Sequence, residues 1–222
     1  MNMIHARVGL QQRILPEYRV EFFDRLATAC LQGLSVFAGS PRPEEAVETA
    51  SRLTVANYAR AHNLHLFSGK SYCYWQLGVL PWLVRWQPRV LITEINPRNL
   101  SNPSAARWMR LRGRPVIGWG LGIPRGGALS SLLYRNLLRH MQAVISYSAG
   151  GAEQYIKAGM NPSRVFVAAN AVTPRPATPP ITRPALIEGT PQILFVGRLQ
   201  PRKRVDTLLH ALAALPPEEQ PR

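Results

Sequence analysis

The strongest chemical signal in this chain is a short basic loop that contains Arg198 and Lys203. The loop follows an apolar run, residues 193–196, of the kind found in a strand that is buried on both faces. Leucines at helical spacing come directly after it, in residues 205–215. Ligands of open α/β sheets bind where a strand's carboxyl end meets a helix's amino end, and the unpaired N–H groups of the helix favour an anion. An Arg fork and a Lys charge can hold phosphate oxygens, so the loop predicts a diphosphate or nucleotide site, with a solvated basic turn as the alternative.

The remaining polar residues favour chemistry without a metal. The chain contains two aspartates, Asp24 and Asp206, so no D-x-D pair can hold a divalent cation against a diphosphate. The five histidines and two cysteines show no zinc-ligand spacing. We therefore expect Arg and Lys to neutralise the phosphate charge, with no metal and no cofactor.

Glu94 is an acidic residue at the end of an apolar run in a very basic chain. A carboxylate at the end of a strand could orient an acceptor hydroxyl group. Pairing with Arg98, four residues later, is the more ordinary explanation, because an arginine at that spacing readily neutralises a carboxylate. The sequence favours the ion pair and leaves the other role open.

Composition predicts a globular protein with anionic partners. The chain is 46% hydrophobic and carries a net charge of +15 from 24 Arg and 3 Lys against 12 acidic residues. That charge fits phosphates, nucleic acid or an acidic membrane surface, and does not choose among them. Cys30 and Cys73 lie in apolar surroundings and the amino terminus lacks the core of a signal peptide, so we expect a cytoplasmic location.

Short apolar runs alternate with helical patterns along residues 1–172, which predicts an α/β fold with a doubly wound, Rossmann-like parallel sheet. The expected strands are residues 4–10, 34–38, 64–67, 90–93, 116–119, 143–147 and 165–168, and the expected helices are 18–31, 101–111, 128–141 and 149–158. The aromatic segment 71–92 is interrupted by Pro and Arg too often to span a membrane. It predicts a buried helix, with contact to a bilayer interface as the alternative.

Residues 173–191 hold six prolines and read as an extended linker. After the linker, residues 192–222 provide one strand pattern and one helix pattern. A stable parallel domain needs several such units to bury both faces of its sheet. We therefore expect 192–222 to be the start of a second, incomplete Rossmann-like domain.

The segment V-G-R-L-x-P-x-K, followed by x-V-D-x-L-L-x-A-x-x-x-L, resembles the opening of the donor domain of retaining glycosyltransferases of family 4, which have the two-domain GT-B fold. The resemblance implies that Arg198 and Lys203 neutralise the diphosphate of a nucleotide-sugar such as a UDP- or GDP-sugar. Arg204 stands where the family usually has Gly. The family's later E-x7-E motif does not occur before the chain ends, so the resemblance implies a donor domain that is truncated.

The resemblance continues more weakly into residues 1–172. Residues 7–27 are similar to the family's first strand, loop and helix, which makes Gly9 the loop glycine. Arg13 and Arg19 flank this glycine, and the two interpretations for each are a side chain that faces the cleft and a solvated residue at the start of a helix. Residues 114–125 resemble the strand and loop where many members carry a His before Gly. That loop includes Gly120, and Leu121 occupies the place of the His and cannot hydrogen-bond a sugar. In residues 144–172 a helix is expected to be capped by Ser148, and Asn170 to form a turn at the domain exit.

The resemblance implies sugar transfer with retention, from a nucleotide-sugar to a sugar, polysaccharide or lipid-linked acceptor, in cell-surface polysaccharide or glycolipid synthesis. Little activity is expected of this chain alone. It is interpreted as a fragment, or as a non-catalytic partner subunit of a split enzyme. Peripheral contact with an anionic membrane at the inner face is compatible with the charge and with the family. A basic nucleic-acid-binding protein is the alternative from another class, but the arginines form no continuous stripe and no binding motif occurs.

Overall fold

The computed structural model describes residues 3–124, 126–169, 177–180, 182, 193–197, 199 and 201–216. The chain divides into two units, Met1–Pro174 and Arg175–Arg222. Arg198, Asn170 and most of the predicted linker lie outside the described residues. The domain boundaries therefore stay predictions at residues 172 and 191. The interpretation of residues 192–222 as the start of a donor domain also stays a prediction.

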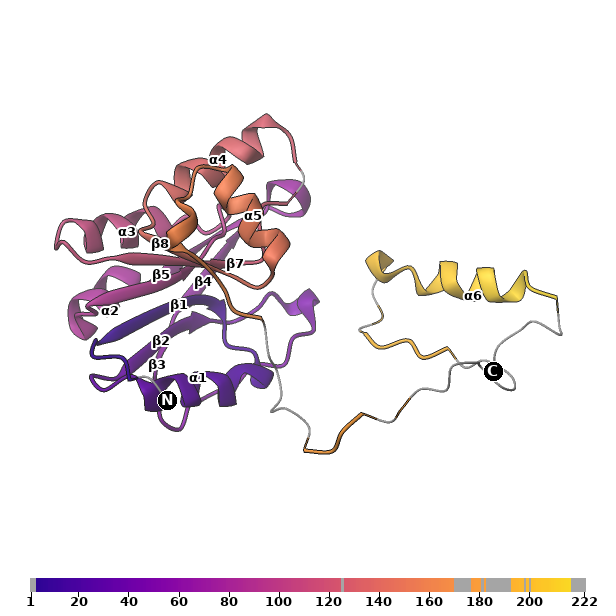
Figure 1. Ribbon diagram of the computed structural model, residues 1–222, viewed down its shortest axis with the longest axis horizontal. Helices are drawn as coiled ribbons and strands as arrows, with labels where there is room; N and C mark the ends of the chain where they lie inside the picture. The colour runs from indigo at the N-terminus through magenta and orange to yellow at the C-terminus, as the bar shows by residue number, and fades with distance from the viewer. Residues whose placement is uncertain are drawn as a thin grey trace. The chain divides into compact units, whose positions relative to one another are not determined.

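A seven-stranded parallel sheet forms the centre of the first unit, in the order β3-β2-β1-β6-β7-β8-β9 (Figure 1). Every pair of neighbouring strands in it is parallel. The strands are β1 (Val8–Ile14), β2 (Leu34–Gly39), β3 (Asn57–Arg60), β6 (Val90–Glu94), β7 (Val116–Gly120), β8 (Ala143–Ser146) and β9 (Val165–Val167).

Helices cover both faces of this sheet (Figure 1). One face packs against α1 (Val20–Ala29), whose Phe23 and Ala27 join a core with Val8, Leu10 and Val36. The other face carries a second core, built with side chains of α2 (Val79–Trp86), α3 (Asn102–Arg110), α4 (Ala128–Leu138) and α5 (Ala149–Lys157). Short 3-10 turns lie at Glu17–Arg19, Pro43–Glu45, Gly69–Ser71 and Pro162–Arg164. The predicted α/β, Rossmann-like fold is confirmed.

The first strand runs further than its apolar residues indicate. A strand over 4–10 was predicted, whereas β1 ends at Ile14 and Ile4 makes only an isolated bridge to Cys30. Gln11 and Gln12 continue the strand and are buried, 1% and 2% exposed. The Gln11 amide N–H and the Gln12 amide oxygen form hydrogen bonds in the interior, which a pattern of apolar residues does not show.

The predicted strand 64–67 belongs to an antiparallel hairpin outside the main sheet. This hairpin pairs β4 (His62–Leu66) with β5 (Cys73–Leu77), in the register His65↔Tyr74. The prediction missed β5, and also missed β3, which is a polar strand at the edge of the main sheet.

The buried helix predicted in the aromatic segment is confirmed as α2. Trp82 stacks on Phe37 with ring centroids 4.9 Å apart, and its indole N–H donates to Ser35 Oγ at 3.0 Å. Tyr72, Tyr74 and Trp82 are all buried. In the described part of the chain, no helix has the length and apolar character needed to cross a membrane.

The second unit is described in part. Residues 193–196 form no strand and are exposed, which contradicts the strand predicted there. A parallel strand requires a neighbour to hydrogen-bond with, and no described residue pairs with this run. The helix that follows is confirmed as α6 (Val205–Ala213), preceded by a 3-10 turn at Pro201–Lys203.

Candidate functional site

The strand order creates a point in the first unit where ligands of doubly wound sheets usually bind. From β1 the chain moves outward to β2 and β3, and it then returns to place β6 on the other side of β1. The connections therefore diverge between the carboxyl ends of β1 and β6, and such a switch point leaves a crevice above the sheet. Arg13 lies near the end of β1 and Glu94 is the last residue of β6.

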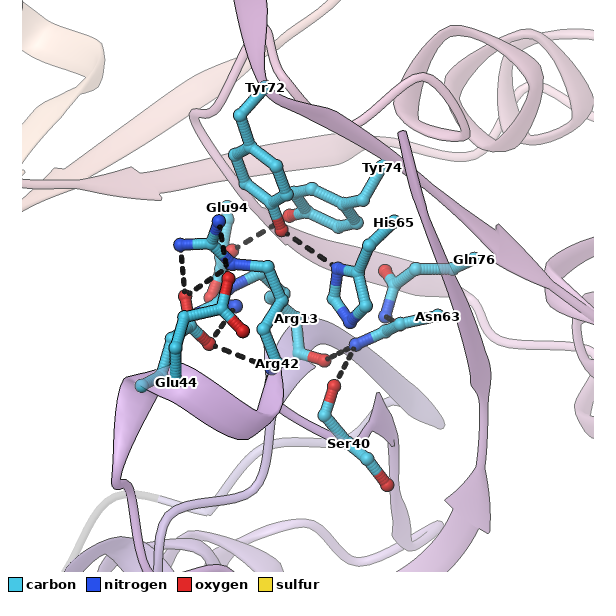
Figure 2. A network of polar contacts seen from close by, with 11 residues as sticks. Arg13, Ser40, Arg42, Glu44, Asn63, His65, Tyr72, Tyr74, Gln76 and Glu94 are labelled. Carbon is cyan, nitrogen blue, oxygen red and sulfur yellow. Dashed lines mark hydrogen bonds and ion pairs between the residues drawn. The ribbon is translucent and has the colours of Figure 1, made fainter. Parts of the chain in front are cut away.

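The β4–β5 hairpin is fastened to the carboxyl end of β1 by buried amides. Gln76 accepts a hydrogen bond from Gln11 Nε2 at 3.0 Å and donates to the carbonyl of Gln12 at 2.9 Å. Asn63 Nδ2 donates to the carbonyl of Arg13 at 2.7 Å and to that of Ser40 at 2.8 Å. These bonds bring the hairpin's His65, Tyr72 and Tyr74 over the switch point, as Figure 2 shows.

Arg13 is held in a partly buried ion pair. Its Nη1 lies 2.6 Å from Glu45 Oε2, and both side chains are less than one-fifth exposed. Glu45 also accepts hydrogen bonds from the guanidinium of Arg42. That guanidinium lies 4.3 Å from the centre of the Tyr72 ring, and both residues appear in Figure 2. Burial alone would raise the pKa of Glu45, but the hydrogen bond and charge of Arg13, helped by Arg42, outweigh it and hold that pKa below its ordinary value. Burial opposes the charge of Arg13 as well, yet Glu45 keeps the pKa of Arg13 above its usual range.

The pKa of Glu94 is shifted in the opposite direction from the pKa of Glu45. Burial raises the pKa of Glu94, and the Arg13 backbone N–H and the charges of Arg13 and Arg19 offset only part of that rise. The hydroxyl of Tyr74 donates to Glu94 Oε2 at 3.4 Å. Burial, and next the Glu94 charge, hold the pKa of Tyr74 well above its ordinary value, so this hydroxyl stays a donor. Glu94 is thus a carboxyl group with a raised pKa at the switch point.

The predicted ion pair between Glu94 and Arg98 is wrong. Both residues are described, and no ion pair joins them; the Arg98 guanidinium lies 6.0 Å from the centre of the Tyr72 ring instead. The chain turns sharply after β6, where the Arg98 backbone N–H is bound by Asn96 Oδ1 at 3.1 Å, so sequence spacing does not bring the two side chains together.

Arg19 lies beside the same edge of the sheet, near the ends of β7 and β8. Its guanidinium donates to Gln12 Oε1 at 3.3 Å and to the Tyr147 hydroxyl at 3.2 Å. It also faces the rings of Trp119 and Tyr147, at 5.2 and 5.7 Å from their centres. Next to it, Gln12 Nε2 and Trp119 Nε1 are buried donors with no hydrogen-bond partner in the described part of the chain. The Arg19 guanidinium therefore provides a cation at this edge, while the two N–H groups beside it lie below the accessible surface.

Comparison with solved structures shows that the fold of this chain is a known one. The apo form of the lipopolysaccharide outer core galactosyltransferase WaaB is similar over 94% of this chain and 57% of its own, with a TM-score of 0.57 and 17% identity. This chain shares its fold with WaaB.

Two further similarities are weaker. Anabaena Alr3699/HepE in complex with UDP-glucose matches 75% of this chain and 44% of its own, with a TM-score of 0.48 and 11% identity. The UDP-GlcNAc 2-epimerase from Methanocaldococcus jannaschii matches 78% and 46%, with a TM-score of 0.43 and 10% identity. This chain therefore spans about half the length of the solved proteins it resembles. No protein-family model and no curated protein sequence matches it. The solved structures support a GT-B fold, whereas family 4 stays a prediction.

Both predicted cleft glycines lie where a side chain would clash with a neighbour. Gly9 was expected in a loop, but it lies inside β1, paired with Ser35 and Leu91. A Cβ there would stand 3.1 Å from Trp82 and from Pro88, so a glycine lets this segment pack closely on the strand. The loop assignment of Gly9 is wrong for this reason. Gly120 is at the carboxyl end of β7, where a Cβ would stand 2.5 Å from the Tyr155 hydroxyl.

The other predicted residues are placed as follows. Leu121 follows β7 and is 72% exposed. Lys203 is exposed in the 3-10 turn before α6, whereas Arg198 lies outside the described residues, so their pairing is a prediction. Ser148 accepts a hydrogen bond from the Gly151 N–H at 3.1 Å, which confirms it as a helix cap.

Sequence reasoning missed the hairpin side chains and Glu45. One signal was available: Tyr72 and Tyr74 alternate around Cys73 with the period of a strand. No comparable signal identifies Glu45, because it meets Arg13 across 32 residues of sequence.

Proposed function

We propose that this chain takes part in the transfer of a sugar from a nucleotide-sugar donor to a sugar, polysaccharide or lipid-linked acceptor, and that its first unit provides the acceptor side. The observation that carries the proposal is the fold shared with WaaB, a lipopolysaccharide outer core galactosyltransferase, over 94% of this chain. The polar edge at the β1/β6 switch point supports it, because that edge is where a doubly wound sheet binds its ligand.

Donor binding is assigned to the second unit. In a retaining transfer the bond between the anomeric carbon and the phosphate oxygen breaks, and the leaving diphosphate keeps the electron pair. Arg198 and Lys203 would stabilise the negative charge as it develops, which requires no metal. Membership of family 4 and retention of configuration are parts of this proposal, and so is a role in cell-surface polysaccharide or glycolipid synthesis.

Acceptor binding is assigned to the switch point. A carboxyl group with a raised pKa can hydrogen-bond a sugar hydroxyl whether or not it is ionised. Glu94 has that character, and Tyr74 fixes the position of its Oε2. Arg19 lies along the same edge and would bind acceptor oxygens. Glu94 therefore orients the acceptor hydroxyl in this proposal.

Calorimetric titration of the chain with UDP, GDP, UDP-sugars and GDP-sugars tests the proposed binding of the donor. We expect one of these nucleotides to bind, and Lys203→Ala to weaken binding about tenfold or more, because a hydrogen bond to a charged group contributes about 1.5–3 kcal/mol. Two controls should bind like the unaltered chain: Arg52→Ala, at an exposed arginine of the first unit, and Glu94→Gln, on the acceptor side. Absence of nucleotide binding, or loss of binding only in Glu94→Gln, would contradict the assignment.

Turnover is a separate test. Because the E-x7-E motif does not occur in this chain, we expect little or no transfer from UDP- or GDP-sugars by the chain on its own. Measurable release of UDP or GDP in the presence of acceptor sugars would show that this expectation is wrong.

A further inference from the structure

The β4–β5 hairpin has polar side chains on its inner face and apolar side chains on its outer face. The inner face contains the residues that lie over the switch point, which are Asn63, His65, Tyr74 and Gln76 (Figure 2). Alternate residues of a strand point to opposite faces, so Leu64, Trp75 and Leu77 belong to the outer face. They are 45%, 38% and 46% exposed. A surface hairpin usually has the reverse arrangement, with its polar side chains toward water.

The outer face of the hairpin continues onto a neighbouring segment. Leu64 and Trp75 lie opposite each other in the register of β4 and β5. On the other side of β5, Asn99 pairs with Tyr74, and both are buried. The next residue, Leu100, therefore points to the same side as Trp75 and is 37% exposed. These three segments together present a row of apolar side chains to solvent.

Two adjoining features enlarge this apolar surface. Gly78 alone separates Leu77 from α2, whose Leu80 and Val84 are 39% and 54% exposed. At the turn of the hairpin, Phe67 is 76% exposed and has a φ of 57°, which is unfavourable for a side chain of this size. A specific interface buries roughly 800 Å² on each partner. The hairpin, its turn and α2 together approach that area, whereas the two strands alone do not.

This apolar surface lies in a part of the sequence that has almost no charge. Between Arg60 and Arg85 the chain contains a single charged residue, Lys70, although its net charge is +15. Two copies of so basic a chain repel each other over most of their surfaces. The hairpin and the start of α2 therefore provide a region where two copies can approach with little repulsion.

The exposed leucines of α4 lie in different surroundings. Leu129, Leu132 and Leu133 are 70%, 60% and 48% exposed. The exposed Arg135 and Arg139 follow them, and the whole stretch 95–152 contains no Asp or Glu. Two copies that met through α4 would bring these arginines together without a carboxylate between them, so charge favours the hairpin over α4 for self-association.

We propose that two copies of this chain pair through the outer faces of their β4–β5 hairpins, around a twofold axis. In such a contact the same patch is used on both copies, so it must be complementary to itself. Trp75 and Phe67 of one copy would pack on the leucines of the other, since aromatic side chains are frequent anchors of interfaces. An acidic partner protein would find only Lys70 to pair with there, so the surface suits a second copy better. The dimer goes beyond the proposed sugar transfer and does not depend on it.

Sedimentation velocity over a range of protein concentrations tests the dimer. We expect a reversible equilibrium between monomer and dimer. The double variant Leu64→Lys/Leu77→Lys should weaken the dimer at least about hundredfold, because it removes apolar contact from both copies and places like charges opposite each other. Raising the salt concentration should strengthen the dimer of the unaltered chain, since salt screens the repulsion between two basic copies.

A matched control adds the same two charges outside the hairpin. Leu111 and Leu129 are 72% and 70% exposed, so Leu111→Lys/Leu129→Lys should dimerise like the unaltered chain. Far-UV circular dichroism and thermal unfolding verify that both double variants are folded. The proposal is overturned if the unaltered chain is a monomer at every concentration or if both variants weaken the dimer equally. It is also overturned if the hairpin variant still dimerises, which would place the contact elsewhere, or if added salt dissociates the dimer. Nucleotide titration of the same variants is independent of all these outcomes.

Discussion

Two short apolar runs meet opposite environments in the two units of this chain. Strand β2 in the first unit is buried at every residue, hydrogen-bonded to β1 on one side and β3 on the other. Residues 193–196 in the second unit are at least as apolar, yet Leu194 is 86% and Val196 82% exposed. The comparison shows that an apolar run becomes a buried parallel strand only where neighbouring strands satisfy its backbone and helices cover its faces.

Matched leucine truncations give the largest expected contrast between the units. Leu91 in β6 is completely buried, whereas Leu209 in α6 is 61% exposed. Leu91→Ala should lower the free energy of unfolding by about 2–5 kcal/mol, because it leaves a cavity in the sheet core. Leu209→Ala should change it by less than about 0.5 kcal/mol. Urea unfolding followed by circular dichroism measures both, and equal losses would mean that α6 is packed as tightly as the sheet.

Loss of the Arg13–Glu45 ion pair should lower the free energy of unfolding of the first unit by a smaller amount. Glu45→Gln should destabilise the protein by about 1–3 kcal/mol at neutral pH, between the values for exposed and fully buried pairs. The pKa of Glu45 is lowered in the folded state, so its contribution is present above the ordinary pKa of about 4.5 and is lost as pH falls through the lower folded value.

Thermal unfolding as a function of pH tests the sign of this linkage. The unaltered chain should lose stability on acidification below about pH 4.5, and Glu45→Gln should lose less over the same interval. A matched Glu44→Gln variant is a control, because the Glu44 side chain is 62% exposed in its pair with Arg42. If Glu44→Gln had the larger effect, the burial of the Arg13–Glu45 pair would not be important for stability.

The smallest expected effect concerns the turn before α6. Arg204 has φ 51° and ψ 41°, a left-handed conformation that costs a non-glycine residue about 1 kcal/mol. Arg204→Gly should therefore leave α6 as stable or stabilise it by up to about 1 kcal/mol. Ala211→Gly, inside the same helix, should destabilise it by about 1 kcal/mol. Helix content from circular dichroism during thermal unfolding distinguishes the two, and a loss of helix in Arg204→Gly would contradict the left-handed assignment.

Much of the fold could be predicted from local patterns. The strands near 34–38, 90–93 and 116–119 appear within a residue of their predicted bounds, because each is an apolar run covered on both faces. The Ser148 cap was also predictable, since a serine side chain satisfies an N–H of the helix that follows it. In both cases the cause of the structure lies within a few residues of sequence.

The candidate site was predicted less completely. Arg13, Arg19 and Glu94 were identified as candidates, and all three lie along the carboxyl edge of the sheet. Their partners were not predicted: Glu45, Tyr74 and Tyr147 come from distant segments. Gly9 was assigned to a loop through the family resemblance, whereas the strand continues past it through Gln11 and Gln12, whose side chains form hydrogen bonds in the interior.

The sequence by itself determined the alternation of strands and helices, the excess of positive charge and the turn chemistry, because these depend on side-chain type and near neighbours. Only the tertiary structure decided which cation pairs with which carboxylate and which carboxyl group has a raised pKa. It also decided that the leucines of α4 face outward. These properties depend on burial and on contacts between segments tens of residues apart, where desolvation and charge act through space and not along the chain.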